Sequence, residues 1–337
     1  MTASAEYLWY KLLRLEGFGP VSLGILYRTI REQALTVRDV FEMDEAAFSA
    51  AFPELGRGRL ASARHAAFSA LEEDVVLREY RELQINGVHV VHPDCGCYAA
   101  RLVAHFAHGA PVALLCRGNL RLLTQPSVAI IGSRGASHGG LEIAGGLASD
   151  AALLGYNVVS GYAKGVDTRA HLGALEAGGT TSIVLSFGIL RFSKKRAFDP
   201  FPLESAAVVV SQFLPYANWS AGNAMTRNKL VCALSQAVVV VESRPRRDGR
   251  GRASGTFDAG KVALQMGVPL FVVTPSALGT DGEGNGELLL IGGIEIPARH
   301  GMEAVLGHLQ RVEGASGDPV SNAKQGSLFD DLGGSSR

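Results

Sequence analysis

The sequence has no excess of charge of either sign. Its 337 residues include 32 Lys and Arg and 32 Asp and Glu, so the formal net charge at pH 7 is zero with neutral histidines. This balance excludes a protein that coats nucleic acid through general basicity. Any contact with a polyanion has to come from a local patch of cations.

Cysteine is also scarce. The four cysteines are Cys95, Cys97, Cys116 and Cys232. They show no disulfide framework, which predicts a protein that stays reduced in the cytoplasm. His92, His105 and His108 lie near the first pair, but a C-x-C pair with scattered histidines matches no standard spacing of zinc ligands. We therefore expect no metal and no other cofactor.

Long hydrophobic runs are missing as well. No run reaches the length of a membrane span, and the N-terminus lacks the basic and then apolar layout of a secretory signal. The apolar share of 47% still suffices for a sizeable core. These features predict a cytoplasmic protein without membrane contact, built from one large domain and an appendage.

The sequence does contain a β-α-β-α-β pattern between Ser127 and Gly188. Short β-branched runs alternate with alanine-rich segments of helical spacing, as expected for a parallel sheet covered on both faces. Ser137 is placed to cap the first helix and Asp167 to cap the second. The strands of this unit are predicted at Val128–Ile131, Asn157–Ser160 and Thr181–Ser186. Further strands are predicted at Val88–Val91, Pro111–Asn119, Ala206–Ser211, Val238–Val241 and Pro269–Thr274. The fold class is therefore α/β, with a doubly wound, mostly parallel sheet.

Small or polar residues end most of the apolar strand runs. They are Ser133, Ser160, Ser186, Ser211, Glu242 and Thr274. The carboxyl ends of the strands form the ligand crevice of a doubly wound sheet. Packing alone would not require polar groups there, so this edge is predicted to carry a site.

The predicted crevice lacks a dinucleotide fingerprint. The loop Gly132–Gly135 has no G-x-G-x-x-G pattern, and Gly161 stands where an acidic residue would follow the second strand. Arg134 is expected beside a helix N-terminus, and Lys164 lies in the equivalent loop after the second strand. Two cations and two helix N-termini indicate phosphate. The alternative is that Arg134 pairs with a surface carboxylate and Lys164 is solvated.

A third group of basic residues follows a glycine-punctuated loop that contains Trp219 and Asn223. We expect a helix to begin at the adjacent residues Arg227, Asn228 and Lys229. A helix start otherwise prefers acidic side chains, so cations there are better explained if they face a bound anion.

Several ordered motifs together resemble the DNA-processing protein A (Smf) family over roughly Leu12 to Ile296. The motifs are Gly132-Ser133-Arg134, Ser160-Gly161, Ala163-Lys164-Gly165-Val166-Asp167, Ala170-His171, Arg227-Asn228-Lys229, Leu234-Ser235 and Ser254-Gly255-Thr256. The resemblance implies an extended Rossmann-like fold that binds single-stranded DNA and passes it to a RecA-type recombinase in DNA uptake, recombination or repair. It also implies a homodimer and no catalysis. The phosphate-binding set would be Ser133, Arg134, Gly161, Lys164, Arg227, Asn228 and Lys229, with backbone amides near Ser133 and Gly161 assisting.

This interpretation divides the chain into four parts. Residues 1–84 form an N-terminal helical domain, 85–124 a bridging segment, 125–311 the Rossmann-like domain and 312–337 a disordered tail. In the helical domain, Gly17–Pro20 has the outline of a helix-hairpin-helix turn, as in SAM-like domains, and it could offer amides to a DNA phosphate. The alternative is an ordinary glycine turn between packed helices, and Gly56–Arg59 is equally ambiguous.

Two loops are rich in basic residues. Lys194, Lys195 and Arg196 lie beside Phe192 and Phe198, a pattern that could hold a nucleic-acid backbone and stack its bases. The alternative is a mobile loop with a solvated run of charge.

The second basic loop spans Arg244–Arg252 and includes Arg246, Arg247 and Arg250. Its arginines are interleaved with Pro and Gly, which predicts a flexible loop. Density and position favour contact with a polyanion over simple solvation.

Two functions other than DNA binding stay open. A nucleotide-derivative sensor or a phosphoribohydrolase-like enzyme on the same fold would need a carboxylate in the crevice, and Glu242, Asp167 and Asp258 are candidates. The Pro-Gly-Gly-x-Gly-Thr pattern of such hydrolases is absent. An adaptor in a defence system is the other alternative.

The tail carries a short motif formed by Gln325, Leu328 and Phe329. It resembles the Gln-x-x-Leu-Phe motif by which bacterial proteins dock on the sliding clamp. The alternatives are that the tail docks on this protein's own core or has no partner.

Overall fold

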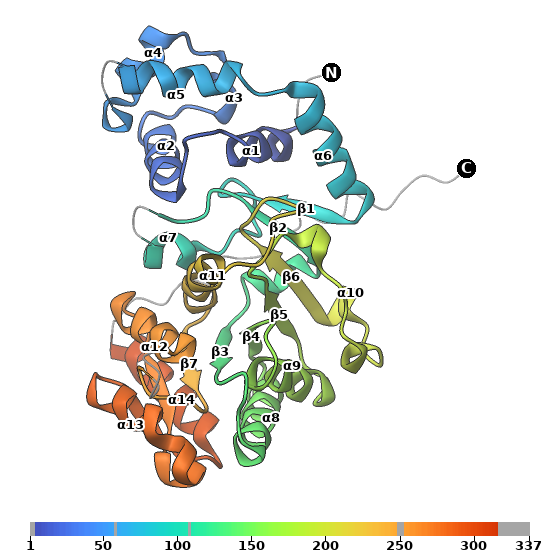
Figure 1. Cartoon of the computed structure of the whole chain (residues 1–337), viewed down its shortest axis with the longest axis vertical. Coiled ribbons are helices and arrows are strands. Elements are labelled where there is room, and N and C mark those ends of the chain that lie inside the picture. Colours follow the sequence, from blue (N-terminus) through green and yellow to red (C-terminus); the bar gives the residue numbers. More distant parts are fainter. Residues whose placement is uncertain (1–3, 57–58, 107–108, 248–252, 316–337) are drawn as a thin grey trace.

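The computed structural model of the chain describes residues 4–56, 59–106, 109–247 and 253–315 (Figure 1). Its centre is a nine-stranded sheet with the order β1-β2-β6-β5-β4-β3-β7-β8-β9. The pairs from β6 to β9 in this order are parallel, whereas β2 pairs antiparallel with both β1 and β6. The predicted α/β class with a mostly parallel sheet is confirmed.

The strands follow the apolar runs of the sequence. Their bounds are β1 Val88–Val91, β2 Leu114–Gly118, β3 Ser127–Ile131, β4 Asn157–Gly161, β5 Thr181–Val184, β6 Ala207–Ser211, β7 Ala237–Val240, β8 Leu270–Val273 and β9 Ile294–Ile296. All residues of the six strands β3, β4, β5, β6, β7 and β8 are buried. Burial on both faces explains why these runs are continuously apolar and do not alternate.

Helices cover both faces of the parallel part. They are α7 Ala100–Phe106, α8 His138–Leu153, α9 Val166–Glu176, α10 Leu203–Ala206, α11 Ala221–Ala233, α12 Gly255–Gln265, α13 Glu283–Leu290 and α14 Gly301–Ala315. In β3, Val128 and Ile130 share a core with α8, α9 and α14, whereas Ala129 and Ile131 share one with α11 and α12. Among the described residues, no helix is long and apolar enough to cross a membrane.

The boundary predicted for the disordered tail is wrong at its start. Val312 belongs to α14, which continues to Ala315. Met302, Val305 and Leu309 of the same helix are buried, and this apolar stripe anchors α14 to the sheet, so its last turn extends past the predicted boundary.

The first part of the chain is helical, as predicted. It contains α1 Ala5–Leu13, α2 Pro20–Glu32, α3 Val37–Glu42, α4 Glu45–Ala51, α5 Arg59–Ser69 and α6 Glu73–Ile85. Gly17, with φ of 76°, and Gly19, the N-cap of α2, form the turn between α1 and α2. The contact of this turn with DNA stays a prediction.

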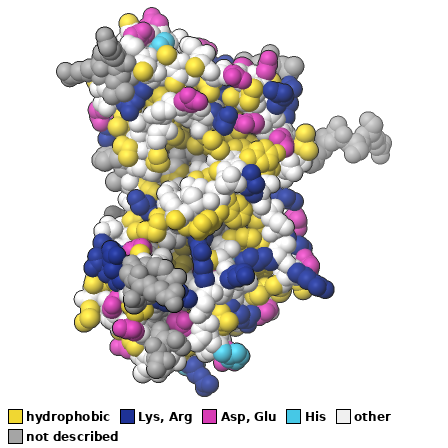
Figure 2. All heavy atoms as spheres, viewed as in Figure 1, with side chains coloured by type: hydrophobic (Ala, Val, Ile, Leu, Met, Phe, Trp, Pro, Cys, Tyr) yellow, Lys and Arg dark blue, Asp and Glu magenta, His cyan; other side chains and the backbone are white. Residues whose placement is uncertain are grey.

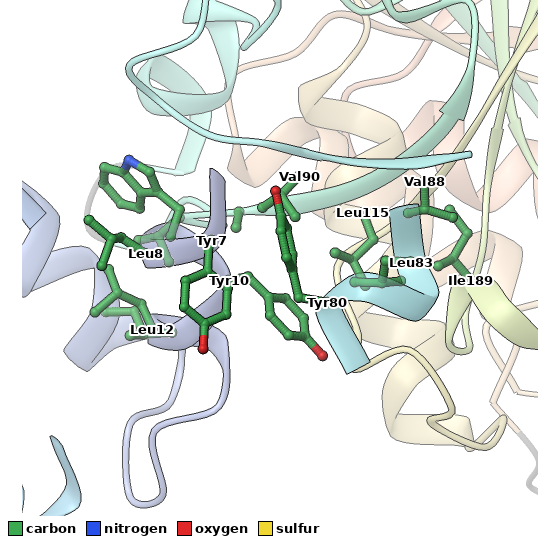
Figure 3. Packing of buried hydrophobic residues seen from close by; sticks show 14 of the residues in the cluster. Tyr7, Leu8, Tyr10, Leu12, Tyr80, Leu83, Val88, Val90, Leu115 and Ile189 are labelled. Carbon is green, nitrogen blue, oxygen red and sulfur yellow. The ribbon is translucent and has the colours of Figure 1, made fainter. Parts of the chain in front are cut away.

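These helices share one hydrophobic core with the antiparallel edge of the sheet. Figure 3 shows Tyr7 and Tyr10 of α1 and Tyr80 of α6 close to Val90 and Leu115 of the sheet. The tyrosine hydroxyls of α1 reach carboxylates of α6, as in the 2.9 Å bond from Tyr10 to Glu79. The helical part is therefore packed on the sheet and not tethered by a linker.

Candidate nucleic-acid interface

The polar groups predicted at the carboxyl edge surround a cleft. The chain leaves β3 through α8 toward β4 on one side, and β7 lies on the other side of β3. A cleft of about 460 Å³ opens at this switch point and is lined by the loops after β3, β4 and β7 and by the starts of α11 and α12. We call it the switch-point cleft. It lies where ligands bind in open α/β sheets.

The loop after β3 brings one exposed cation to the cleft. Arg134 lines it, and its guanidinium carbon lies 5.7 Å from the centre of the Trp219 ring, which is 53% exposed. The Ser133 amide donates a 2.8 Å hydrogen bond to the Glu242 carbonyl oxygen. That amide is therefore engaged within the protein, and the assistance of other amides near Ser133 to a phosphate stays a prediction.

Gly165 caps α9, and the prediction that Asp167 would do so is wrong. Gly165 has φ of 77°, and a Cβ there would collide with the Ser133 carbonyl oxygen. Only glycine fits where the loops after β3 and β4 touch. Asp167 is the second residue of α9, and its side chain is buried.

Asp167 and Arg227 form a buried ion pair beneath the cleft. Arg227 Nη1 lies 3.9 Å from Asp167 Oδ2, and both side chains are 8% exposed. Arg227 Nη1 also donates to the Val184 carbonyl oxygen at 3.0 Å. Burial raises the pKa of Asp167, and Arg227 opposes that shift. A Cβ on Gly161 would collide with both partners, so the glycine ending β4 makes room for the pair.

Arg227 and Lys229 do not stand at a helix start, contrary to the prediction. Helix α11 begins at Ala221 because Ser220 caps it, its hydroxyl oxygen accepting from the Asn223 amide at 3.0 Å. Arg227 is therefore in mid-helix and points inward. Its buried Nε has no hydrogen-bond partner among the described residues.

The structure brings together only part of the predicted phosphate set. Ser133, Arg134, Gly161, Arg227 and Asn228 line the switch-point cleft. Lys164 and Lys229 are exposed and lie outside this lining. In Figure 2, several Lys and Arg side chains cross the lower half of the visible face.

Three residues outside the predicted phosphate set contribute to the cleft. Trp219 and Arg244 line it, and so does Ser254, whose hydroxyl oxygen caps α12 by accepting from the Phe257 amide at 3.2 Å. The amides at a helix start favour an anion. Trp219 could have been found as a large aromatic residue in the loop between β6 and α11 at the carboxyl edge.

The first basic loop is more ordered than expected. Lys195 Nζ donates to the carbonyl oxygens of Tyr162 and Ala163, both at 3.1 Å, and to Thr168 Oγ1 at 2.9 Å. Burial lowers the pKa of Lys195. Lys195 therefore fixes the loop after β4 and is not free to hold a DNA backbone.

The environments of the residues near Lys195 also differ from the prediction. Phe198 is fully buried in the hydrophobic core beside the sheet, so its ring cannot stack on a base. Lys194 pairs with Asp199 at 3.3 Å, and Arg196 is exposed.

The second basic loop is anchored at both ends. The Arg246 amide donates to Glu287 Oε2 at 2.6 Å, and Arg247 forms an antiparallel bridge with Ala253. Backbone pairing thus holds the described ends of a loop that composition alone predicted to be irregular. Arg250 lies outside the described residues.

The carboxylates near the cleft have different environments. Glu242 accepts from the Ser137 amide at 2.9 Å and from its hydroxyl at 2.6 Å at the start of α8. Ser137 caps α8, as predicted, by accepting from the Gly140 amide at 3.0 Å. Glu242 and Asp167 are therefore held by structural partners, and Asp258 lines the cleft in a half-exposed position.

His171 is buried behind the cleft in a closed hydrogen-bond network. A carbonyl oxygen only accepts, so Nε2–H donates to the Gly161 carbonyl at 2.6 Å. Nδ1 lies 2.6 Å from Thr181 Oγ1, and the Thr181 hydroxyl donates to the Val158 carbonyl oxygen at 2.7 Å. Burial lowers the pKa of His171 to about 4, and the nearby cations Lys195 and Arg227 act in the same direction.

We expect this histidine to make the protein less stable in acid. Its pKa is about 6.5 in the unfolded chain. Between that pH and about 4, His171 binds a proton in the unfolded state but not in the folded state. The free energy of unfolding should fall by about 1.4 kcal/mol per pH unit from pH 6.5 to 4 and lose roughly 3 kcal/mol in all.

The measurement is urea unfolding at pH 7.5, 5.5 and 4.5 for the native chain and His171→Gln. The variant should lose distinctly less stability across this range, relative to its own value at pH 7.5. Equal losses in both proteins would contradict the assignment.

The model of the DNA recombination-mediator protein A family matches residues 89–294. The Streptococcus pneumoniae protein named DNA processing protein DprA is 32% identical over 178 residues, which are 51% of this chain and 58% of that protein. The Escherichia coli protein named Smf is 30% identical over 196 residues, 58% of this chain and 50% of that protein. The chain spans about half the length of the curated relatives that it matches.

Solved structures agree on the fold. The X-ray structure of DprA from Streptococcus pneumoniae has a TM-score of 0.70 at 23% identity and covers 91% of this chain and 98% of its own. A Helicobacter pylori DNA processing protein A, described for its mode of binding single-stranded DNA, has a TM-score of 0.54 at 24% identity and covers 65% and 96%. The family match extends from β1 to the start of β9 and includes every residue that lines the cleft. The chain therefore belongs to the DNA recombination-mediator protein A family, the family that its ordered motifs resemble.

Proposed function

We propose that this protein binds single-stranded DNA in the switch-point cleft. The observation that carries the proposal is the pair formed by Arg134 and Trp219, an exposed cation over an exposed indole ring 5.7 Å away. A guanidinium can hold a phosphate while an aromatic face stacks a base. Arg244 and the start of α12 add positive potential in the same cleft.

Single strands fit this arrangement better than duplexes. A base can stack on Trp219 only if it is free of its own neighbours, as in an unpaired strand. The relative from Helicobacter pylori described with single-stranded DNA shares the fold and supports the proposal.

We propose binding without catalysis. Of the carboxylates near the cleft, Glu242 is held by Ser137 and Asp167 by Arg227. Asp258 remains as a half-exposed carboxylate in the lining, and a single carboxylate supplies no pair of acid and base groups. Incubation of the protein with nucleotides and labelled oligonucleotides should therefore release no product.

Salt dependence tests the proposed contacts. We assume that the cations of the cleft, Arg134 and Arg244 among them, neutralise two or three phosphates. The logarithm of the association constant for oligo-dT should then fall with log salt at a slope of about −1.4 to −2.1, at roughly 0.7 per phosphate. Fluorescence anisotropy over a salt series measures the slope. Arg134→Ala should make it shallower by about 0.7.

Lys229→Ala is the matched control, because Lys229 is an exposed cation of α11 outside the cleft lining. It should leave the slope within error of the native value. Equal effects of the two substitutions, or tighter binding of duplex than of oligo-dT, would overturn the proposed site.

We further propose that the bound strand passes to a RecA-type recombinase and that the protein acts as a homodimer, as family membership implies. Leu290, Ile291 and Ile294 are 88%, 46% and 38% exposed beside the free edge of β9 and offer an apolar surface for a second copy. Light scattering at micromolar concentration should give twice the mass of 35.5 kDa.

Clamp binding also remains a proposal, since Gln325, Leu328 and Phe329 lie outside the described residues. A peptide covering Asn322–Leu332 should bind the purified clamp, and Leu328→Ala with Phe329→Ala should abolish that binding.

A further inference from the structure

The Cys95-Gly96-Cys97 segment lies outside the switch-point cleft, in the loop between β1 and α7. Its two thiols are free and half-buried, and the Sγ atoms lie 2.8 Å apart. Cys116 and Cys232 are also free but fully buried. Cys95 and Cys97 thus lie close together and are partly accessible to solvent, whereas the other two cysteines are buried.

Two backbone turns hold the sulfur atoms together. The Cys95 amide donates to the His92 carbonyl oxygen at 3.0 Å, and the Tyr98 amide donates to the Cys95 carbonyl oxygen at 3.1 Å. Gly96 between them is exposed, and a Cβ built there meets nothing within 4 Å. A small molecule can therefore approach the pair from the side of Gly96.

The two sulfur atoms are not chemically equivalent. The hydrogen bond from Cys97 lowers the pKa of the Cys95 thiol to about 6, while the same interaction and burial raise the pKa of Cys97. The contact between the two sulfur atoms therefore favours the thiolate form of Cys95 and the protonated form of Cys97. An attacking thiolate beside a protonated second thiol is the arrangement of dithiol exchange sites.

We propose that Cys95 and Cys97 form a thiol–disulfide exchange site for low-molecular-weight disulfides of the glutathione type. The Cys95 thiolate attacks one sulfur of the small disulfide, which forms a mixed disulfide and releases one thiolate that takes up a proton. Cys97 then loses its proton and attacks Cys95 Sγ, which releases the second small thiol. The dithiol is oxidised to one protein disulfide, and one small disulfide is reduced to two thiols.

A metal does not explain the pair equally well. Within the described ranges, no group of three or more His, Cys, Asp or Glu side chains is arranged to hold a metal ion. Two sulfurs alone leave a tetrahedral site half filled.

The exchange site adjoins the contact between the helical part and the sheet. Asp94 accepts from Trp9 Nε1 of α1 at 3.2 Å and lies 3.8 Å from Arg31 Nη1 of α2. The His92 ring stacks on Trp9 with centroids 5.6 Å apart. Oxidation therefore adds a covalent bond to the loop on which α1 and α2 rest.

The test uses the full-length protein and oxidised glutathione. After incubation at graded ratios of oxidised to reduced glutathione, free thiols are blocked with N-ethylmaleimide and the protein is digested with trypsin. Cys95 and Cys97 fall in one peptide, Glu82–Arg101, without other cysteines. This peptide should become two hydrogens lighter and escape the label, and dithiothreitol should reverse the change.

Two variants separate the roles of the thiols. Cys97→Ser should accumulate a glutathione adduct on Cys95, because no second thiol resolves it. Cys95→Ser should react at least about tenfold more slowly, because its remaining thiol is protonated. Cys232→Ser, a control at a buried thiol, should behave as the native protein.

A measurement on the native chain guards against variants that fail to fold. The rate of iodoacetamide labelling at Cys95 should rise with a midpoint near pH 6, the value set by the Cys97 contact. The proposal is overturned if both thiols stay fully reactive toward the label at every glutathione ratio. Disulfide-linked dimers on a non-reducing gel in place of the internal bond would overturn it as well.

Discussion

Asp167→Ala should destabilise the protein by about 3 to 5 kcal/mol. The substitution leaves the Arg227 guanidinium in a buried site with its carboxylate partner removed, and an uncompensated charge there is far more costly than the intact pair. Chemical denaturation followed by circular dichroism measures the loss. Because α9 and α11 meet through this pair, the effect should extend to the whole cooperative unit.

Two companions make the prediction specific. Asp167→Ala combined with Arg227→Met removes both charges and should recover most of the loss, since an apolar replacement of a buried pair is often close to neutral. Glu176→Ala breaks the exposed pair with Arg169, whose side chains are 48% and 35% exposed, and should cost less than about 1 kcal/mol. A double variant as unstable as the single one would contradict the ion-pair explanation.

The second large effect is expected on DNA affinity. Trp219→Ala should weaken binding of oligo-dT by about 1 to 3 kcal/mol, or roughly 5- to 150-fold, through loss of one stacked base. Trp219→Phe keeps an aromatic face and should retain most of the affinity. Anisotropy titrations at one fixed salt concentration give the ratios.

Arg134 and Trp219 should also be coupled. The guanidinium lies over the indole ring, so each residue holds the other in place. A double-mutant cycle with Arg134→Ala and Trp219→Ala should therefore be non-additive by more than about 0.5 kcal/mol. Affinity of Trp219→Ala within twofold of the native value, with the fold intact by circular dichroism, would remove Trp219 from the interface.

The sheet could be predicted from the sequence because its strands leave a direct mark. Val128–Ile131 and Val238–Val241 are continuously apolar, which occurs when both faces are covered, and the structure places β3 and β7 there within one residue. Turn chemistry was equally readable at Ser137, which caps α8 through a local contact. Features set by neighbours along the chain were thus accessible.

The electrostatics of the site could not be predicted in the same way. Asp167 and Arg227 are far apart in the sequence, and only the folded chain brings the carboxylate of α9 within 3.9 Å of the guanidinium of α11. The sequence left Lys195 open to contact with nucleic acid or to solvation, whereas its three hydrogen-bond acceptors all lie within the protein. Sequence shows that a charge exists, whereas its availability to a ligand depends on long-range contacts.

The antiparallel pairing of β2 with β6 has a consequence for synthesis on the ribosome. The Asn119 side chain, just after β2, bonds to the Ser205 carbonyl oxygen, 86 residues later. At about 5 to 20 residues per second, β2 waits roughly 4 to 17 s for its partner to be made. Of its two neighbours in the sheet, only β1 is available to pair with β2 during that interval. The N-terminal helices share their core with Val88, Val90 and Leu115, so they can cover this face of the β1–β2 pair while the nascent chain grows.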